Sequence, residues 1–162
     1  MPYRVQNLGP ERLRLAFSLV RMVHPELSLE AWRRYARPRL APRAAGLAAR
    51  RGILSLEDQH GCILALYAFR VEPDLRRGAL MRCEYIAAID LLNPRRAMRA
   101  LIQEIRNRAD ITGCTAIRIA TPHSPGALAA ELAENGFARD RTDYVLAPDG
   151  GQRAGPAGSR PA

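Results

Sequence analysis

The chain has 162 residues, of which 48% are hydrophobic, and it carries a formal net charge of +9 at pH 7. This length suits one domain with a continuous core and is too short for two. No segment approaches the ~20 consecutive apolar residues of a membrane span, and the N-terminus lacks a signal-like apolar run, so we expect a cytoplasmic protein without a membrane partner. Cys62, Cys83 and Cys114 are widely separated among apolar neighbours, which predicts buried, reduced thiols and no metal site.

The positive charge comes from arginine alone, since the 25 basic residues include no lysine. This bias leaves open whether the arginine-rich surface is functional or a consequence of genome composition. The densest basic stretch is residues 33–51. The only aromatic residues in or next to it that could stack on bases are Trp32 and Tyr35, and both fit a helix face. The pattern favours a solvated face and loop over a nucleic-acid surface, although nucleic acid is not excluded as a partner.

The first part of the chain predicts a short edge strand at residues 3–5, followed by two helices. Ser28 is the expected N-cap of the second helix, residues 29–37, which Pro38 ends. The first helix ends at His24-Pro25 and presents one apolar stripe at three- and four-residue spacing: Leu13, Ala16, Phe17, Val20 and Val23.

The pattern then changes to a period of two and to apolar runs, which indicates strands. Residues 53–56 and 62–69 are expected to form an antiparallel hairpin through the polar turn 57–61. A second polar break at residues 72–78 leads to a long central strand at residues 79–89. Together these segments predict a three-stranded meander.

A helical period returns at Pro94, with Asn93 as its expected N-cap. The apolar side is formed by Met98, Leu101, Ile102, Ile105 and Ala109, and the polar side by Arg99, Gln103, Arg106 and Arg108. Residues 114–120 form the next strand, so this strand–helix–strand unit predicts a parallel pair with a right-handed crossover.

A last helix is expected at residues 125–134, ended by Asn135-Gly136, and a final strand from Phe137 and residues 144–146. Residues 148–162 are rich in glycine and proline and are expected to be a disordered tail beyond a single domain at residues 1–147. The fold class is therefore α+β, with a mixed sheet of about six or seven strands flanked by about four helices.

This order of elements resembles the GNAT superfamily of N-acetyltransferases over residues 3–146, and local motifs carry the resemblance further. Asp90-Leu91-Leu92 resembles the D-L-V at the end of the family's fourth strand, and Gly136-Phe137 resembles the G-F after its last helix. The spacing L-L-x-x-L-x-x-x-A-x-x-x-G-C of some members is matched by Leu101, Ile102, Ile105, Ala109, Gly113 and Cys114.

The resemblance implies acetyl-CoA or another acyl-CoA as co-substrate, held through its pyrophosphate by a loop of the form Q/R-x-x-G-x-G/A. In this chain Asn93 falls at the first motif position, while Arg96 and Met98 fall at the glycines. A Cβ at those positions obstructs close approach of phosphates, so we expect Arg95, Arg96 and Arg99 to supply charge-assisted bonds instead. Backbone groups of Leu91 and Leu92 are expected to hold the pantetheine arm.

Glu84, in the middle of the long central strand, is the expected general base, because a carboxylate facing the cleft can deprotonate an ammonium through a water. A structural alternative pairs Glu84 with Arg82 or Arg118. Many family members have a tyrosine as general acid four residues before the G-F glycine, where this chain has Leu132, so Tyr144 or a water is expected to substitute.

Two functions stay open at this point. The first is an N-acyltransferase that moves an acyl group from CoA to an unknown amine by direct attack. The second is a non-catalytic GNAT-fold binding or regulatory module with an altered cleft and a basic partner-binding surface. The resemblance is also compatible with a homodimer.

Overall fold

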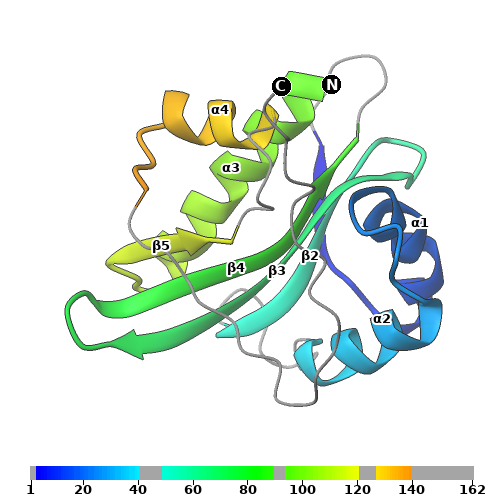
Figure 1. Cartoon of the computed structure of the whole chain (residues 1–162), viewed down its shortest axis with the longest axis horizontal. Coiled ribbons are helices and arrows are strands. Elements are labelled where there is room, and N and C mark those ends of the chain that lie inside the picture. Colours follow the sequence, from blue (N-terminus) through cyan, green and yellow to red (C-terminus); the bar gives the residue numbers. More distant parts are fainter. Residues whose placement is uncertain (1–2, 41–48, 90–93, 121–126, 140–162) are drawn as a thin grey trace, which may run out of the picture.

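The computed structural model describes residues 3–40, 49–89, 94–120 and 127–139, which form one mixed sheet with helices packed on it (Figure 1). The elements follow the chain in this order: β1 (Arg4–Asn7), a 3₁₀ turn (Pro10–Arg12), α1 (Leu13–Val23), α2 (Leu29–Ala36), a second 3₁₀ turn (Arg37–Arg39), β2 (Arg51–Glu57), β3 (Ile63–Asp74), β4 (Gly78–Ala88), α3 (Pro94–Ile111), β5 (Ala116–Ile119) and α4 (Ala127–Glu134). The strands lie in the order β1-β2-β3-β4-β5, with antiparallel neighbours up to β4 and a parallel β4–β5 pair.

The predicted fold class is confirmed: the structure is α+β, with a mixed sheet and helices in the expected order. The last predicted strand, residues 144–146, lies outside the described residues, as does the predicted tail. Phe137 was expected to contribute to that strand, but its N–H instead donates to the Leu132 carbonyl oxygen at 3.0 Å and closes the end of α4. Gly136 has a φ of +80°, a left-handed conformation that glycine adopts without side-chain strain, and this conformation allows the helix to end here.

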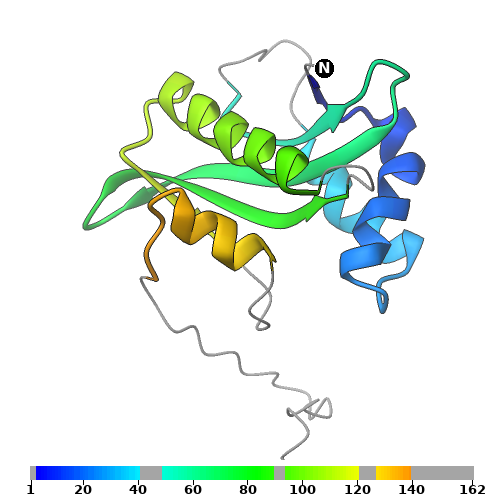
Figure 2. The same cartoon turned by 90° about the horizontal axis from the view of Figure 1, so that it is seen from above.

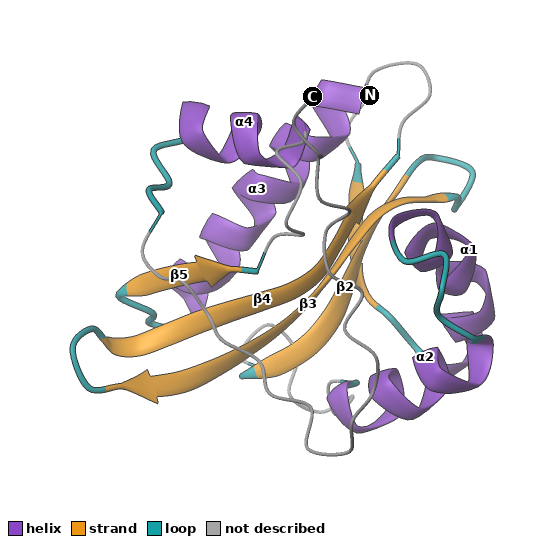
Figure 3. Ribbon diagram, viewed as in Figure 1, coloured by secondary structure: helices purple, strands orange, loops and turns teal. Residues whose placement is uncertain are grey.

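The sheet separates two groups of buried side chains, because successive residues of a strand point to opposite faces. On one face α1 and α2 pack against Ile53, Leu66 and Ala68. On the other, α3 packs against Leu54, Tyr67 and Phe69. Figures 2 and 3 show α1 and α2 side by side and apart from α3.

The pair of helices α1 and α2 is fixed by two local features. The Ser28 hydroxyl accepts a hydrogen bond from the Ala31 N–H at 3.1 Å, which confirms the predicted N-cap. The indole Nε1–H of Trp32 donates to the Leu13 carbonyl oxygen at 2.8 Å, and the ring is 1% exposed. This buried bond fixes how α2 lies against the start of α1, and so where the rest of α2 faces.

The hairpin of β3 and β4 is longer than the sequence predicts. The polar stretch from Glu72 was expected to break the strand, yet β3 continues to Asp74 and stays paired with β4 as far as Gly78. The Asp74 carboxylate then accepts hydrogen bonds from the Arg76 and Arg77 N–H groups, both at 3.0 Å, and closes the turn. Cross-strand pairing therefore extends the strand through residues whose composition indicates a turn.

Three further expectations about exposure were wrong. Glu57, expected in a polar turn, ends β2 and is 2% exposed, where it binds the Arg12 guanidinium and the Ser55 hydroxyl. Arg108, expected on the polar side of α3, is 2% exposed, with its guanidinium 5.7 Å from the Phe69 ring centroid. Each buried charge has one partner distant in sequence, Arg12 for Glu57 and Phe69 for Arg108, in addition to a local one, Ser55 or Glu104. Cys62, expected to be buried, is exposed.

Candidate functional site

The long strand β4 pairs irregularly with β3 near its C-terminal end. Leu66 pairs with Ala87 and Ala68 with Glu84, so two residue steps of β3 lie opposite three of β4. The extra residue is a β-bulge, which bends a strand and breaks its regular pairing. The β4–β5 register ends at Cys83 and Ile119, and beyond it, within the described residues, β4 pairs with β3 alone. Within the described ranges, the β5 side of β4 is therefore without a paired strand from Glu84 onward.

Glu84 itself lies on the face of the sheet that points toward α2, immediately before the bulge. The Tyr35 hydroxyl donates to Glu84 Oε2 at 3.0 Å, and Arg82 Nε donates to Glu84 Oε1 at 2.9 Å. The Glu84 side chain remains 24% exposed. The predicted pairing with Arg82 is therefore confirmed, whereas Arg118 lies against Asp74 at 3.6 Å. A fixed, partly exposed carboxylate is compatible with a role in proton transfer.

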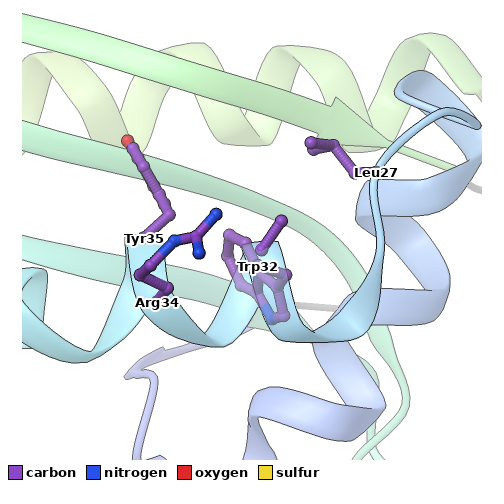
Figure 4. Close-up of a pocket in the computed structure, with 5 residues that line it drawn as sticks. Leu27, Trp32, Arg34 and Tyr35 are labelled. Carbon is purple, nitrogen blue, oxygen red and sulfur yellow. The ribbon is translucent and has the colours of Figure 1, made fainter.

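A hollow is formed by α2 and the residues just before it (Figure 4). It is lined by Leu27, Ala31, Trp32, Arg34 and Tyr35. Tyr35 joins the hollow to Glu84, since its ring lines the hollow while its hydroxyl points to the sheet. The hollow therefore has aromatic and aliphatic walls with one arginine among its lining residues, and Tyr35 connects it to the carboxylate of Glu84.

Tyr35 is the site residue that sequence reasoning missed. Its ring stacks with Trp32 at a centroid distance of 6.0 Å, and the Arg39 guanidinium lies 3.7 Å from its centroid. These contacts hold the phenol in one orientation. The three-residue spacing of Trp32 and Tyr35 indicated only a shared helix face, and the contact with Glu84 is visible only in the structure.

The first turns of α3 carry the arginines expected to hold a pyrophosphate, and two of them face α4. Arg95 Nη2 lies 2.7 Å from Glu134 Oε1, and Arg99 Nε lies 2.5 Å from Glu131 Oε1. Each arginine also contacts the other carboxylate, at 3.3 and 3.4 Å. The hydrogen bond from Arg99 lowers the pKa of Glu131, and the same bond raises the pKa of Arg99. We call Arg95, Arg99, Glu131 and Glu134 the α3–α4 ion-pair cluster.

The other predicted site residues are distributed differently. Arg96 points away from the ion-pair cluster, with its guanidinium 5.8 Å from the Tyr3 ring centroid. Met98 is half-buried and packs against the core beneath α3. Four predicted site residues, Leu91, Leu92, Asn93 and Tyr144, lie outside the described residues. The structure thus brings Arg95 and Arg99 together and separates them from Arg96.

Over the described ranges, no three His, Cys, Asp or Glu side chains are grouped so that they could hold a metal ion. A membrane-crossing helix is also absent from the described part of the chain, where none is both long and apolar enough.

The chain has the GNAT fold of N-acetyltransferases. Searches against family models and curated protein sequences found no match, so solved structures carry the comparison. An aminoglycoside 6′-N-acetyltransferase from Acinetobacter baumannii is 14% identical with a TM-score of 0.70, over 91% of this chain and 99% of that one. A ribosomal-protein-alanine N-acetyltransferase from Brucella melitensis biovar Abortus 2308 is 16% identical with a TM-score of 0.69, over 90% and 99%.

A third similar structure is an aminoglycoside N-acetyltransferase in complex with CoA, 13% identical with a TM-score of 0.65, over 89% of this chain and 91% of that one. At such identities the likeness is one of fold. Residue roles in this chain therefore rest on its own geometry.

Proposed function

We propose that this protein is an N-acyltransferase that transfers an acyl group from CoA to an amine, with Glu84 as general base. The observation that carries the proposal is the position of Glu84, which lies where the described β4–β5 pairing ends and accepts a hydrogen bond from Tyr35 of the hollow on α2. An acyl donor at the open edge and an amine in the hollow would meet at this carboxylate. The GNAT fold supports the same reaction class, and a cytoplasmic location belongs to the proposal.

An acyl-CoA fits the open edge of β4 chemically. Backbone N–H and C=O groups at an unpaired strand edge are suited to the amide groups of a pantetheine arm. Leu91 and Leu92, which follow β4 in the chain, would continue these contacts. The phosphates would be held by Arg95, Arg96 and Arg99 at the start of α3, because guanidinium groups bind phosphate oxygens through a bidentate fork. The acyl-CoA supplies the acyl group as a reactive thioester.

In the proposed reaction Glu84 accepts a proton from the acceptor ammonium, directly or through a water. The neutral amine nitrogen then bonds to the thioester carbonyl carbon as the carbon–sulfur bond breaks. The sulfur takes a proton from Tyr144 or from water and leaves as the CoA thiol, the proton that the nitrogen loses as the amide forms restores that donor, and Glu84 releases its proton to solvent. The hydrogen bonds from Tyr35 and Arg82 to Glu84 would keep both carboxylate oxygens oriented while an amine approaches.

The α3–α4 ion-pair cluster favours a second candidate, a GNAT-fold module without catalytic activity. Arg95 and Arg99 already contact two carboxylates, so a pyrophosphate must compete with Glu131 and Glu134 for them. A chain whose phosphate site is filled by its own carboxylates could use the cleft for another ligand, or its basic surface for a partner.

Titration with acetyl-CoA separates the two candidates. Binding at a hundred times the dissociation constant stabilises the folded state by ~2.7 kcal/mol, which thermal unfolding detects and calorimetry confirms. For the enzyme we expect this stabilisation in the wild type and in Glu84→Gln, together with a loss of amine acylation in Glu84→Gln by a factor of about 10² to 10⁴. Absence of stabilisation at millimolar acetyl-CoA would reject the acetyltransferase and leave the binding module.

A further inference from the structure

The face of the sheet that carries Glu84 also carries a row of arginines across three strands. Arg70 on β3 pairs in register with Arg82 on β4, and Arg82 pairs in register with Arg118 on β5. Residues directly opposite in neighbouring strands share a face, so the three side chains emerge on the α2 side with Glu84. We call these residues the arginine row. Their side chains are 51, 35 and 24% exposed, respectively, so the row is open to a ligand.

This placement is unfavourable for the sheet alone. Like charges directly opposite each other in adjacent strands are destabilising, and sequence choices that break such a local rule are concentrated at functional sites. The chain offsets the repulsion with one carboxylate per arginine: Glu72 at 2.9 Å from Arg70, Glu84 at 2.9 Å from Arg82, and Asp74 at 3.6 Å from Arg118. The result is an alternating set of charges that contains the proposed base.

One arginine of α2 and one of the 3₁₀ turn that follows it add positive charge to this region. Arg34 lines the hollow, and Arg39 stacks on the Tyr35 ring whose hydroxyl binds Glu84. The arginine row, Arg34 and Arg39 thus contribute five guanidinium groups to this side of the sheet, against the three carboxylates of Glu72, Asp74 and Glu84. The region around Glu84 therefore has a surplus of cations that a bound anion would neutralise.

The ammonium group of an incoming acceptor adds one more positive charge next to Glu84. When the ammonium binds Glu84, it competes with Arg82 for the same carboxylate. An anionic group carried by the acceptor can then take the place of that carboxylate beside Arg82, with Arg118 adjacent in register. Guanidinium–carboxylate and guanidinium–phosphate pairs are among the stronger hydrogen-bonded contacts in proteins.

We propose that the acceptor is a primary amine that carries a carboxylate or phosphate group, with Arg82 and Arg118 binding that anion while Glu84 receives the amine. This inference rests on the proposed function, because it names the class of acceptor. It assigns the arginine row to substrate selection and the hollow beside Tyr35 to the body of the acceptor.

Matched pairs of amines test the inference: L-alanine against L-alaninamide, and O-phosphoethanolamine against ethanolamine. With acetyl-CoA, we expect kcat/KM to be at least about tenfold higher for the anionic member of one or both pairs, as a charge-assisted hydrogen bond predicts. The pair that shows the preference identifies the anion as carboxylate or phosphate. In Arg118→Gln the preference should fall toward one, while Arg76→Gln, an exposed arginine in the β3–β4 turn, should retain it.

Calorimetric titration of the same four amines, without acyl-CoA, separates this inference from the proposed enzyme. Tighter binding of an anionic member, lost in Arg118→Gln, supports the arginine row even if no amine is acylated, in which case only the proposed reaction fails. Asp74 is 12% exposed and loses its ion pair with residue 118 in Arg118→Gln, so the thermal unfolding of that variant is measured first. If Arg118→Gln does not fold, Arg82→Gln is used in its place. Equal binding and equal acylation within both pairs would overturn the inference, as would a preference that survives both substitutions.

Discussion

The Tyr35 hydroxyl donates a hydrogen bond to Glu84, and this contact links the hollow on α2 to the proposed base. A carboxylate held by two donors on different elements has fewer orientations than one held by Arg82 alone. Pre-organised catalytic groups contribute to rate because a small displacement is costly. The function of Tyr35 in this view is to position Glu84, without contact with the reacting atoms.

For Tyr35→Phe we therefore expect kcat to fall by about tenfold, which is the usual value of one hydrogen bond to a charged group. The substitution keeps the ring, so stacking on Trp32 and the contact with Arg39 should persist and the KM for acyl-CoA should be unchanged. Steady-state kinetics at several pH values measure the effect, since a positioning role also displaces the pH profile. Arg14→Gln, on the exposed side of α1, is the matched control. Wild-type kinetics in Tyr35→Phe would contradict the positioning role.

At the scale of elements, the α3–α4 ion-pair cluster joins two helices whose meeting the sequence does not reveal. Residues 95 and 99 are four apart and residues 131 and 134 are three apart, so each pair predicts one helix face. Which faces meet depends on the path of the chain between the helices. The same limit explains why Arg108 and Glu57 were expected at the surface: their partners, Phe69 and Arg12, lie far away in sequence.

Elements with local signals were predicted well from the sequence. The stripe of α1 and the Ser28 cap of α2 depend on residues within a few positions, and both are present in the structure. The extent of β3 was not predicted, because its last residues are held by β4 and not by their own composition. The candidate site shows the same division. Glu84 and its Arg82 partner follow from alternation within one strand, whereas Tyr35 reaches Glu84 from another element.

The ion-pair cluster makes stability depend on pH in a defined direction. Because the hydrogen bond from Arg99 lowers the pKa of Glu131 from its usual value of 4.5, the folded state binds a proton there less readily than the unfolded chain. This contribution is fully present above about pH 4.5 and is lost as the pH falls through the lower, folded-state pKa. We expect Glu131→Gln to melt below the wild type at pH 7 and the difference to shrink below pH 4.5. Melting temperatures at matched pH measure it.

The control for this prediction is Glu26→Gln, which removes an exposed carboxylate in the connection between α1 and α2. Exposed ion pairs contribute little, so its melting temperature should follow that of the wild type at each pH. A difference for Glu131→Gln that stays constant down to pH 3 would show that the carboxylate charge is not what stabilises α4 against α3.

The same cluster predicts a competition with the acyl donor. If Arg95 and Arg99 hold phosphates, the carboxylates of Glu131 and Glu134 oppose binding, and the double variant Glu131→Gln with Glu134→Gln should bind acetyl-CoA more tightly by about tenfold, one charge-assisted contact. Calorimetry measures the dissociation constant, and Arg95→Gln in the same background should reverse the gain. Unchanged or weaker binding in the double variant would mean that these arginines serve α4 and not the donor.

Across the whole molecule, the net charge of +9 is distributed unevenly. Many arginines of the described residues are paired with carboxylates: Arg12, Arg70, Arg82, Arg95, Arg99, Arg108 and Arg118. Other exposed arginines lie on several elements, and five of them lie on α1, α2 and the 3₁₀ turn after α2, at residues 14, 21, 33, 34 and 37. Paired charges attract a polyanion weakly, so any attraction for nucleic acid should be centred on this helical side.

For nucleic acid we expect binding that depends on charge alone. Each arginine that neutralises a phosphate contributes about −0.9 to the slope of log K against log salt, so affinity for a labelled DNA duplex should fall steeply between 50 and 200 mM salt, with no preference for sequence. Fluorescence anisotropy measures the slope, and Arg33→Gln with Arg37→Gln should reduce its magnitude by up to about two. The double variant should acylate amines as the wild type does, since neither residue belongs to the proposed site. Tight binding of one sequence at 200 mM salt would instead identify the arginines of α2 as a specific nucleic-acid surface, and the binding module would become the better account of the chain.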